Sequence, residues 1–214
     1  MKARWIVMLL AVVMLVVGGQ FISAQEDSAA KPAASDEKEF EATCPVSGQP
    51  AIEDSIVDLK NGAKVYFCCK NCPKAYTANH EKFALKVARQ LLETGQIVQV
   101  GCPISGGPVN EETLVELGKA KAGFCCENCL AKFNKADDDG KLEIMFAKLD
   151  KGFTRQTKCP VSGKPIVAEH ALEHEGKQVY FCCPNCPKAF EANPAKFMAK
   201  LPQFEKDAGE FSPK

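Results

Sequence analysis

Twelve cysteines in three equivalent sets constrain this chain more than any other feature of its 214-residue sequence. The sets are Cys44, Cys68, Cys69 and Cys72; Cys102, Cys125, Cys126 and Cys129; and Cys159, Cys182, Cys183 and Cys186. Corresponding cysteines of neighbouring sets lie 57 or 58 positions apart. A fixed period of this length indicates an internal repeat, and it predicts three tandem modules.

Each module is expected to contain a turn, a β-hairpin, a cysteine cluster and a helix. The turns read CPVSGQP, CPISGGP and CPVSGKP, and the clusters read YFCCKNC, GFCCENC and YFCCPNC. In the first module, strand-like runs flank Asn61-Gly62, a strong hairpin signal. The third module turns near Glu175-Gly176 and the second at Gly118. Helical spacing of apolar residues within 81–92 completes an α+β plan.

The small size of the modules makes a covalent or metal staple necessary. A chain of about 57 residues buries too little apolar surface to offset its conformational entropy comfortably. Zinc bound by thiolates contributes on the order of 10 kcal/mol to a small module. We therefore expect the cysteines to decide whether each module folds.

The position of the cysteines favours metal binding through thiolates. A turn cysteine, a hairpin and a second cysteine group at a helix start have the geometry of a treble-clef zinc module. Backbone N–H groups at such a junction stabilise thiolates, which are the form that binds metal. Cys69 and Cys72 are three positions apart and Cys68 and Cys72 four, so either pair can converge, and only one of Cys68 and Cys69 need be a ligand.

At these residues the chain resembles the TRASH and YHS domains, small treble-clef-like modules associated with heavy-metal sensing, trafficking and resistance. The resemblance runs through nearly all of 44–197, with an aromatic residue following each cluster at Tyr76, Phe133 and Phe190. In the second module Gly123 replaces the first aromatic residue of the cluster. The resemblance implies the following metal ligands: Cys44, Cys68, Cys72, Cys102, Cys125, Cys129, Cys159, Cys182 and Cys186.

The chain departs from this resemblance at the second position of the turn. There the related domains often have a cysteine, whereas this chain has Ser47, Ser105 and Ser162, and a neutral hydroxyl is a poor zinc ligand. Two kinds of site follow: four thiolates, if Cys69, Cys126 and Cys183 also reach the metal, or three thiolates with an open position. Opposite orientation of successive strand residues favours the second kind, unless the helix begins at Cys68. Zinc is the expected metal, and a three-thiolate site would also suit Cu(I) or another soft heavy metal.

Other interpretations of the cysteines remain open. An exported protein with an even number of cysteines often forms disulfides, which would make the chain a stapled array for binding another protein. A Cys-x-x-Cys sequence such as Cys69 to Cys72 could also act in thiol redox chemistry. His80, His170 and His174 do not recur at equivalent positions, and we expect them at the surface.

The ends of the chain are expected to lie outside the modules. Lys2 and Arg4 precede an apolar run and a small-residue site ending at Ala24, as in a secretory signal peptide; an uncleaved segment would be a membrane anchor. The predicted organisation is a signal peptide at 1–24, an acidic, Ala-rich disordered linker at 25–42, modules at 43–100, 101–157 and 158–205, and a flexible tail at 206–214. We therefore expect a periplasmic or extracellular protein without membrane contact after cleavage.

The composition excludes several function classes. Lys and Arg together number 27, as do Asp and Glu, so no net positive charge attracts nucleic acid. No Ser-His-Asp set, phosphate-binding loop or pair of catalytic carboxylates is apparent in the sequence. The sequence predicts a metal-binding protein, with metal ions and a possible protein as its partners, rather than an enzyme.

Overall fold

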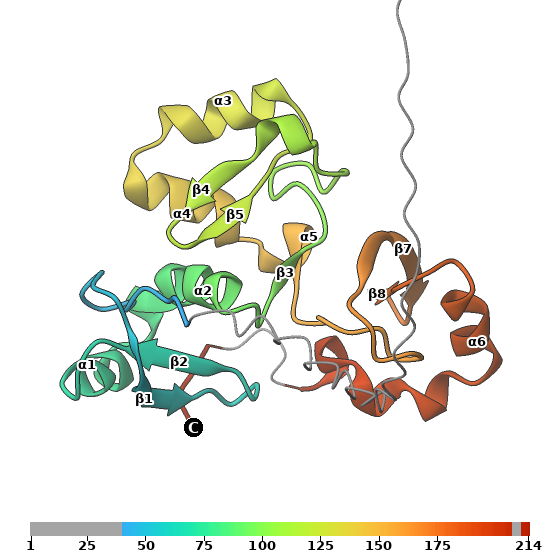
Figure 1. Ribbon diagram of the computed structural model, residues 1–214, viewed down its shortest axis with the longest axis horizontal. Coiled ribbons are helices and arrows are strands. Elements are labelled where there is room, and N and C mark those ends of the chain that lie inside the picture. Colours follow the sequence, from blue (N-terminus) through green and yellow to red (C-terminus); the bar gives the residue numbers. More distant parts are fainter. Residues whose placement is uncertain (1–39, 207–210) are drawn as a thin grey trace, which may run out of the picture. The chain divides into compact units, whose positions relative to one another are not determined.

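The computed structural model of the protein describes residues 40–206 and 211–214 (Figure 1). The predicted signal peptide at 1–24 and most of the predicted linker lie outside the described residues. Within the described ranges, helices are too short or too polar to cross a membrane. These residues form mixed helical and strand structure with small antiparallel hairpins.

The first module contains the predicted hairpin followed by two helices. Strand β1 (Ile52–Asp58) pairs antiparallel with β2 (Lys64–Phe67). Gly62 has a φ of +82°, which an L side chain would oppose, so the turn requires glycine there. Helix α1 (Cys72–Ala78), the 3₁₀ helix η1 (Glu81–Phe83), helix α2 (Ala84–Glu93) and β3 (Val98–Gln99) follow.

The second module repeats this order and adds helices. The 3₁₀ helix η2 (Glu111–Thr113) precedes the hairpin of β4 (Val115–Leu117) and β5 (Ala120–Ala122). Helices α3 (Glu127–Lys135), α4 (Asp138–Phe146) and α5 (Leu149–Gly152) follow, and β6 (Phe153–Thr154) pairs antiparallel with β3. The β3–β6 pair joins the last strand of the first module to the end of the second.

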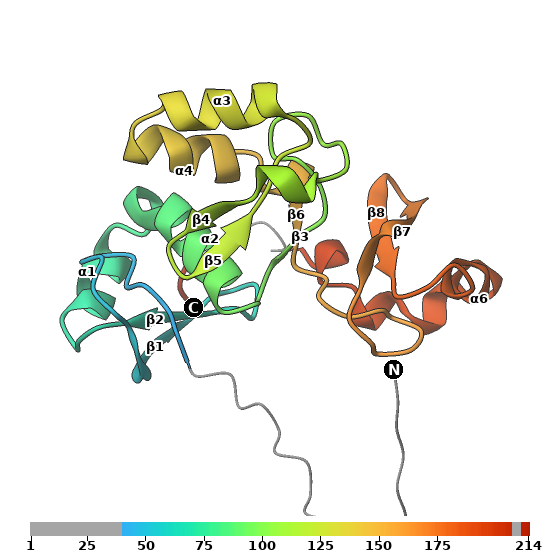
Figure 2. The same cartoon turned by 45° about the horizontal axis from the view of Figure 1, so that its top comes forward.

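The third module has the longest hairpin and the least helix after it. Strand β7 (Val167–His174) pairs with β8 (Lys177–Phe181), across a turn in which Glu175 and Gly176 both have positive φ. Helix α6 (Cys186–Ala192) and three 3₁₀ helices follow: η3 (Pro194–Lys196), η4 (Met198–Lys200) and η5 (Pro202–Phe204). The hairpin and α6 are drawn in orange and red in Figure 2.

The hydrophobic core divides into two clusters that do not follow the three repeats. One cluster contains buried residues of both the first and the second module, from Cys44 to Phe153. Helix α2 contributes to it with Val87 and Leu91, and contacts β2, β5 and α4 (Figure 1). The third module has its own cluster: Cys159, Val179, Phe181, Cys186, Phe190, Phe197 and Leu201.

A buried carboxylate links the first two modules beside their common core. The side chain of Glu93 has no exposed surface. It accepts hydrogen bonds from the backbone N–H and the hydroxyl of Thr43, at 2.7 and 2.9 Å, and from the N–H of Lys119, at 3.1 Å. Gly118 precedes Lys119, and a Cβ at that glycine would lie 1.9 Å from Glu93 Oε1. A glycine is therefore required for the hairpin turn of the second module to reach Glu93.

The end of the chain lies against the first module. The sequence places it in a flexible tail at 206–214, whereas the structure has Pro213 in an isolated β-bridge with Leu59. The Tyr76 hydroxyl donates a hydrogen bond to the Phe211 carbonyl. These contacts attach the last residues to the hairpin and helix of the first module.

Candidate metal centres

Three groups of three cysteines come together, one group in each module. The groups are Cys44, Cys68 and Cys72; Cys102, Cys125 and Cys129; and Cys159, Cys182 and Cys186. Within each group all sulfur atoms lie within 4.8 Å of one another. The first and last cysteines are buried and the middle one is half-buried. All twelve cysteines lie in the described residues and are free thiols there, without a disulfide at bonding distance.

The Cys-Pro-x-Ser-Gly turn presents the first cysteine of each group. In the first module the N–H of Cys44 donates to the Gln49 carbonyl at 2.8 Å, and the N–H of Gly48 donates to the Cys44 carbonyl at 2.9 Å. Both bonds recur in the other modules at distances of 2.7 or 2.8 Å. The turn glycines have φ values near the left-handed region, at +75°, +81° and +74° for Gly48, Gly106 and Gly163. The motif therefore fixes a tight loop around the cysteine backbone.

The serine of the turn lies at the edge of the sulfur cluster. The distance from serine Oγ to the sulfur of the middle cysteine is 3.1 Å in all three modules, for Ser47 and Cys68, Ser105 and Cys125, and Ser162 and Cys182. Each serine oxygen also accepts a backbone N–H from the residue two positions later. The hydroxyl occupies the side of the site where a fourth cysteine would be expected from the resemblance.

The first thiol of each group ionises readily. Burial raises the pKa of Cys44, but hydrogen bonds from the side chain and backbone of Ser47, together with backbone bonds from Cys68 and Val46, lower it to about 7. Equivalent hydrogen bonds, led by those from Ser105 and Ser162, bring the pKa of Cys102 to about 6 and that of Cys159 to about 7. A thiolate is the form that binds a metal ion, so the turn prepares one ligand in each site.

The last thiol of each group has the opposite tendency. Burial, and then hydrogen bonds with the neighbouring thiols, raise the pKa of Cys129 to about 12 and also raise the pKa of Cys72 and Cys186. The last thiol of each group therefore favours its protonated form in the absence of a cation. Because a bound cation stabilises thiolates strongly, it would reverse this preference.

The neighbouring cysteines touch the clusters without belonging to them. The sulfur of Cys69 lies 3.5 Å from that of Cys72, and the sulfur of Cys183 lies 3.5 Å from that of Cys186. In the second module the sulfur of Cys126 is 3.7 Å from that of Cys125. Backbone hydrogen bonds, from Asn71 first in the case of Cys69, lower the pKa of all three thiols. The extra thiol therefore lies beside each site.

The helix starts explain this arrangement. We expected both neighbouring cysteines to reach one metal only if the helix began at Cys68. Helices α1 and α6 begin instead at Cys72 and Cys186, and α3 begins at Glu127. The adjacent cysteines thus precede the body of the helix in all three modules.

Pairs of aromatic residues pack in the same hydrophobic clusters as the buried cysteines of each site. Phe67 and Tyr76 have ring centroids 5.5 Å apart, and the equivalent pairs, Phe124 with Phe133 and Phe181 with Phe190, are 5.2 and 5.6 Å apart. The residue before each phenylalanine is half-buried Tyr66 or Tyr180, but Gly123 in the second module. A Cβ at Gly123 would lie 2.6 Å from Val109 Cγ1, so the second module has no room for an aromatic residue there.

The histidines lie apart from the sulfur groups found in the described residues. His80 Nε2 is 3.2 Å from Ser212 Oγ, and the His174 ring packs edge-on against Phe190 at 5.2 Å. The acidic run at 137–139 caps a helix, since Asp137 Oδ1 accepts the N–H of Gly140 at 2.8 Å.

Sequence reasoning missed three glutamines next to the sites. Gln90, Gln99 and Gln156 each form hydrogen bonds with backbone groups of both segments that carry the ligand cysteines. The position three residues before the turn cysteine offered a partial signal, because it holds glutamine in the second and third modules. In the first module the same position holds Glu41, so glutamine does not recur in all three repeats.

Comparisons with family models, with curated proteins and with solved structures found no match to this chain. The assignment therefore depends on the sites themselves. Three sulfur donors at mutual distances below 4.8 Å suit a soft metal ion. The nine clustered cysteines are thus compatible with one metal ion in each module.

Proposed function

We propose that this protein binds three soft metal ions, one in each module, and exchanges them through a three-thiolate site. The observation that carries the proposal is the threefold recurrence of the same sulfur cluster, with all its sulfur atoms within 4.8 Å. One such cluster could arise from packing alone. Three equivalent clusters, each with the same serine contact at 3.1 Å, are typical of a repeated binding site.

The ligand set favours a site from which metal can leave. Three thiolates hold a soft ion such as Cu(I) or Zn²⁺ while leaving a coordination position open. The extra thiol beside each site can enter that position as another ligand leaves. The thiol of Cys69 is exposed, so it is also accessible to a second carrier.

The sequence adds a cellular setting to the proposal. The residues at 1–24 have the pattern of a signal peptide, and the Cys-Pro turns and aromatic-Cys clusters resemble TRASH and YHS domains. Together they support an exported protein of treble-clef type that captures and passes on copper or another heavy metal. In an oxidising compartment, bound metal would also protect the thiols from forming disulfides.

A structural zinc is the second candidate function, and the burial of the ligands favours it. Cys44 is fully buried and Cys72 is 8% exposed, so metal bound there would be shielded from solvent. In that case zinc would only hold the fold, and the modules would bind another protein. Exchange kinetics separate the two candidates: a carrier releases zinc to a competing chelator within minutes and binds Cu(I), whereas structural zinc is released only on unfolding.

A pair of neighbouring substitutions tests the three-thiolate assignment in the full chain. Cys68→Ser should reduce the metal stoichiometry from three to two, or weaken one site at least tenfold, because a ligand is lost. Cys69→Ser is the matched control and should leave three bound ions. The measurement is metal content after gel filtration, with competition against a chromogenic chelator. Equal loss of metal in both variants would show a four-thiolate site and would contradict the open position.

A further inference from the structure

A single carboxamide bridges the two ligand-bearing segments of each site. We propose that Gln90, Gln99 and Gln156 are positioning residues that hold the turn cysteine and the cluster cysteines at the spacing a metal ion requires. The inference rests on the proposed metal binding and deepens it, because it assigns residues that control affinity without touching the metal.

In the first module the bridge is made by Gln90, whose side chain is fully buried. Its Nε2 donates to the carbonyl of Thr43 at 2.9 Å and to that of Tyr66 at 2.6 Å. Its Oε1 accepts the N–H of Tyr66 at 2.8 Å. Thr43 directly precedes Cys44, and Tyr66 lies two residues before Cys68, so one side chain is bonded to both segments that carry the ligand cysteines.

The second module contains the same three bonds. Gln99 Nε2 donates to the carbonyls of Gly101 and Gly123, at 3.0 and 2.7 Å, and its Oε1 accepts the N–H of Gly123 at 2.8 Å. Gly101 precedes Cys102 and Gly123 lies two residues before Cys125. The bridge therefore has the same register relative to the ligands as in the first module.

The third module repeats the arrangement and adds a second hydrogen bond to the oxygen of the bridging carboxamide. Gln156 Nε2 donates to the carbonyls of Lys158 and Tyr180, and its Oε1 accepts the N–H of Tyr180 at 3.0 Å. Gln203 Nε2 adds a second donor to the same Oε1 at 2.9 Å. Gln156 is 1% exposed, so these bonds are made in a nearly dry environment.

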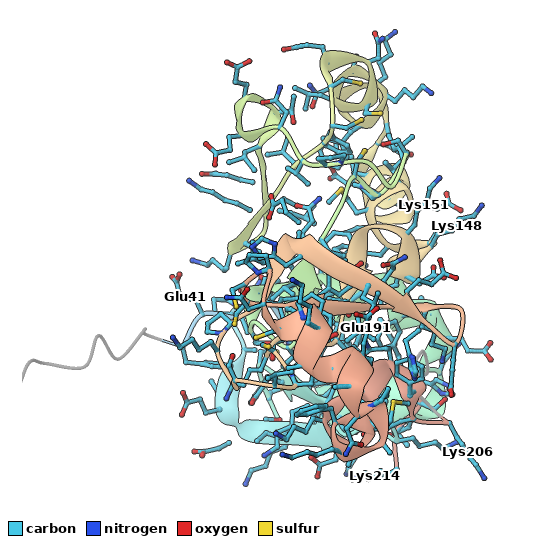
Figure 3. All side chains as sticks on the ribbon, turned by 90° about the vertical axis from the view of Figure 1, so that its right-hand side faces the viewer. Glu41, Lys148, Lys151, Glu191, Lys206 and Lys214 are labelled. Carbon is cyan, nitrogen blue, oxygen red and sulfur yellow. The ribbon has the colours of Figure 1, made fainter. Side chains whose placement is uncertain are left out.

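The three glutamines come from different places in the repeat. Gln99 and Gln156 stand three residues before the turn cysteine, whereas Gln90 belongs to α2 and follows its turn cysteine. Glu41 occupies the equivalent position of the first module and points to the surface, as Figure 3 shows. The same carboxamide thus reaches the same backbone groups by two routes. A repeated sequence alone would not produce this agreement, which indicates that the site requires the group.

The chemistry of the bridge explains why glutamine is needed. Two backbone carbonyls face the Nε2 and one backbone N–H faces the Oε1, so the side chain must donate twice and accept once. A glutamate of the same shape offers no donor when ionised and would direct its charge at two carbonyl oxygens. A buried group left unpaired is costly, and the ligand segments would move apart to relieve it.

The experiment compares Gln156→Glu with Gln178→Glu in the full chain, using Co²⁺ as the probe. Gln178 is an exposed residue of β8 in the same module and meets the bridge through its backbone carbonyl, which accepts a hydrogen bond from Gln203, so its substitution makes the same chemical change in a side chain outside the bridge. Gln156→Glu should weaken one of three Co²⁺ sites by about tenfold to a hundredfold, the usual effect of losing a residue that orients a ligand. It should also change the d–d absorption of that site, and Gln178→Glu should alter neither.

The outcomes of this experiment separate the two proposals. Wild-type affinity and spectrum in both Gln156→Glu and Gln99→Glu would overturn the positioning role while leaving metal binding intact. Unfolding of the third module at saturating zinc, measured by hydrogen exchange, would also overturn it, because the bridge would then be structural. A wild-type protein that binds no Co²⁺ would instead refute the proposed function.

Discussion

The first and second modules differ from the third in how their sites are supported, although all three carry the same cysteine pattern. The first two share one hydrophobic cluster, and Glu93 of the first module accepts hydrogen bonds from Thr43 of that module and from Lys119 of the second. The third relies on a separate cluster of seven buried residues. The same cysteine motif is thus packed against hydrophobic clusters of different size.

The segments after the cysteine clusters account for this difference. Helix α2 brings Val87 and Leu91 between the first two modules, and α4 adds Leu142 and Met145 to the same core. In the third module α6 is followed by three 3₁₀ helices that contain no buried residue, and the segment adds to the core only Phe197 and Leu201, which lie between these helices. Because a small core supplies few kcal/mol, the third module should depend most on its metal ion.

The largest expected effect comes from truncating equivalent aromatic residues. Phe133→Ala and Phe190→Ala each remove a ring from the aromatic pair of a module and should cost about 3–5 kcal/mol. Phe133→Ala should lower hydrogen-exchange protection in the first and second modules together, because they share a core. Phe190→Ala should lower it in the third module alone. Loss of protection confined to the second module in Phe133→Ala would contradict the common core.

A smaller effect is expected where the hairpin turn of the second module meets Glu93. Gly118→Ala introduces a side chain at a φ of +67° and displaces the Glu93 carboxylate, so we expect a loss of about 2–4 kcal/mol. Gly62→Ala is the matched control, because its φ is +82° and no atom lies within 4 Å of the added Cβ. It should cost only about 1–2 kcal/mol. Equal losses of stability in denaturant unfolding would show that Glu93 does not join the modules.

The smallest effect is expected from the exposed ion pair between the same two modules. Lys119 Nζ lies 3.1 Å from Glu41 Oε1, but both side chains are about half exposed. Solvent screening limits such a pair to less than about 1 kcal/mol. Lys119→Ala should therefore change the unfolding midpoint very little and keep the N–H bond to Glu93. A loss of about 2 kcal/mol or more in the free energy of unfolding would show that the exposed ion pair, and not Glu93, makes the main contact between the modules.

Local patterns in the sequence predicted much of the local structure. The hairpin at Asn61-Gly62 forms as predicted, because Gly62 can adopt the positive φ that the turn requires. The apolar spacing of Val87 and Leu91 correctly indicated the buried face of α2. The period of the cysteines predicted three equivalent modules, and the same turn forms around the first cysteine of each. The spacing alone did not choose between Cys68 and Cys69, and that choice came from the resemblance.

Features that depend on long-range contacts could not be predicted in this way. Gln90 looks like an ordinary helical glutamine until the fold brings it to Thr43 and Tyr66. The requirement for Gly118 appears only when Glu93 lies against it. The bridge between Pro213 and Leu59 likewise joins residues separated by most of the chain. None of these contacts leaves a periodic signal in the sequence.

The most direct test of metal binding is the mass of the intact protein under native conditions, after folding with excess zinc and a reducing agent. We predict three bound ions, and removal of zinc should expose the third module to hydrogen exchange first. Alkylation before and after metal removal should show that nine thiols become more reactive. A mass without metal, or with six disulfides in protein purified from its own compartment, would contradict the account.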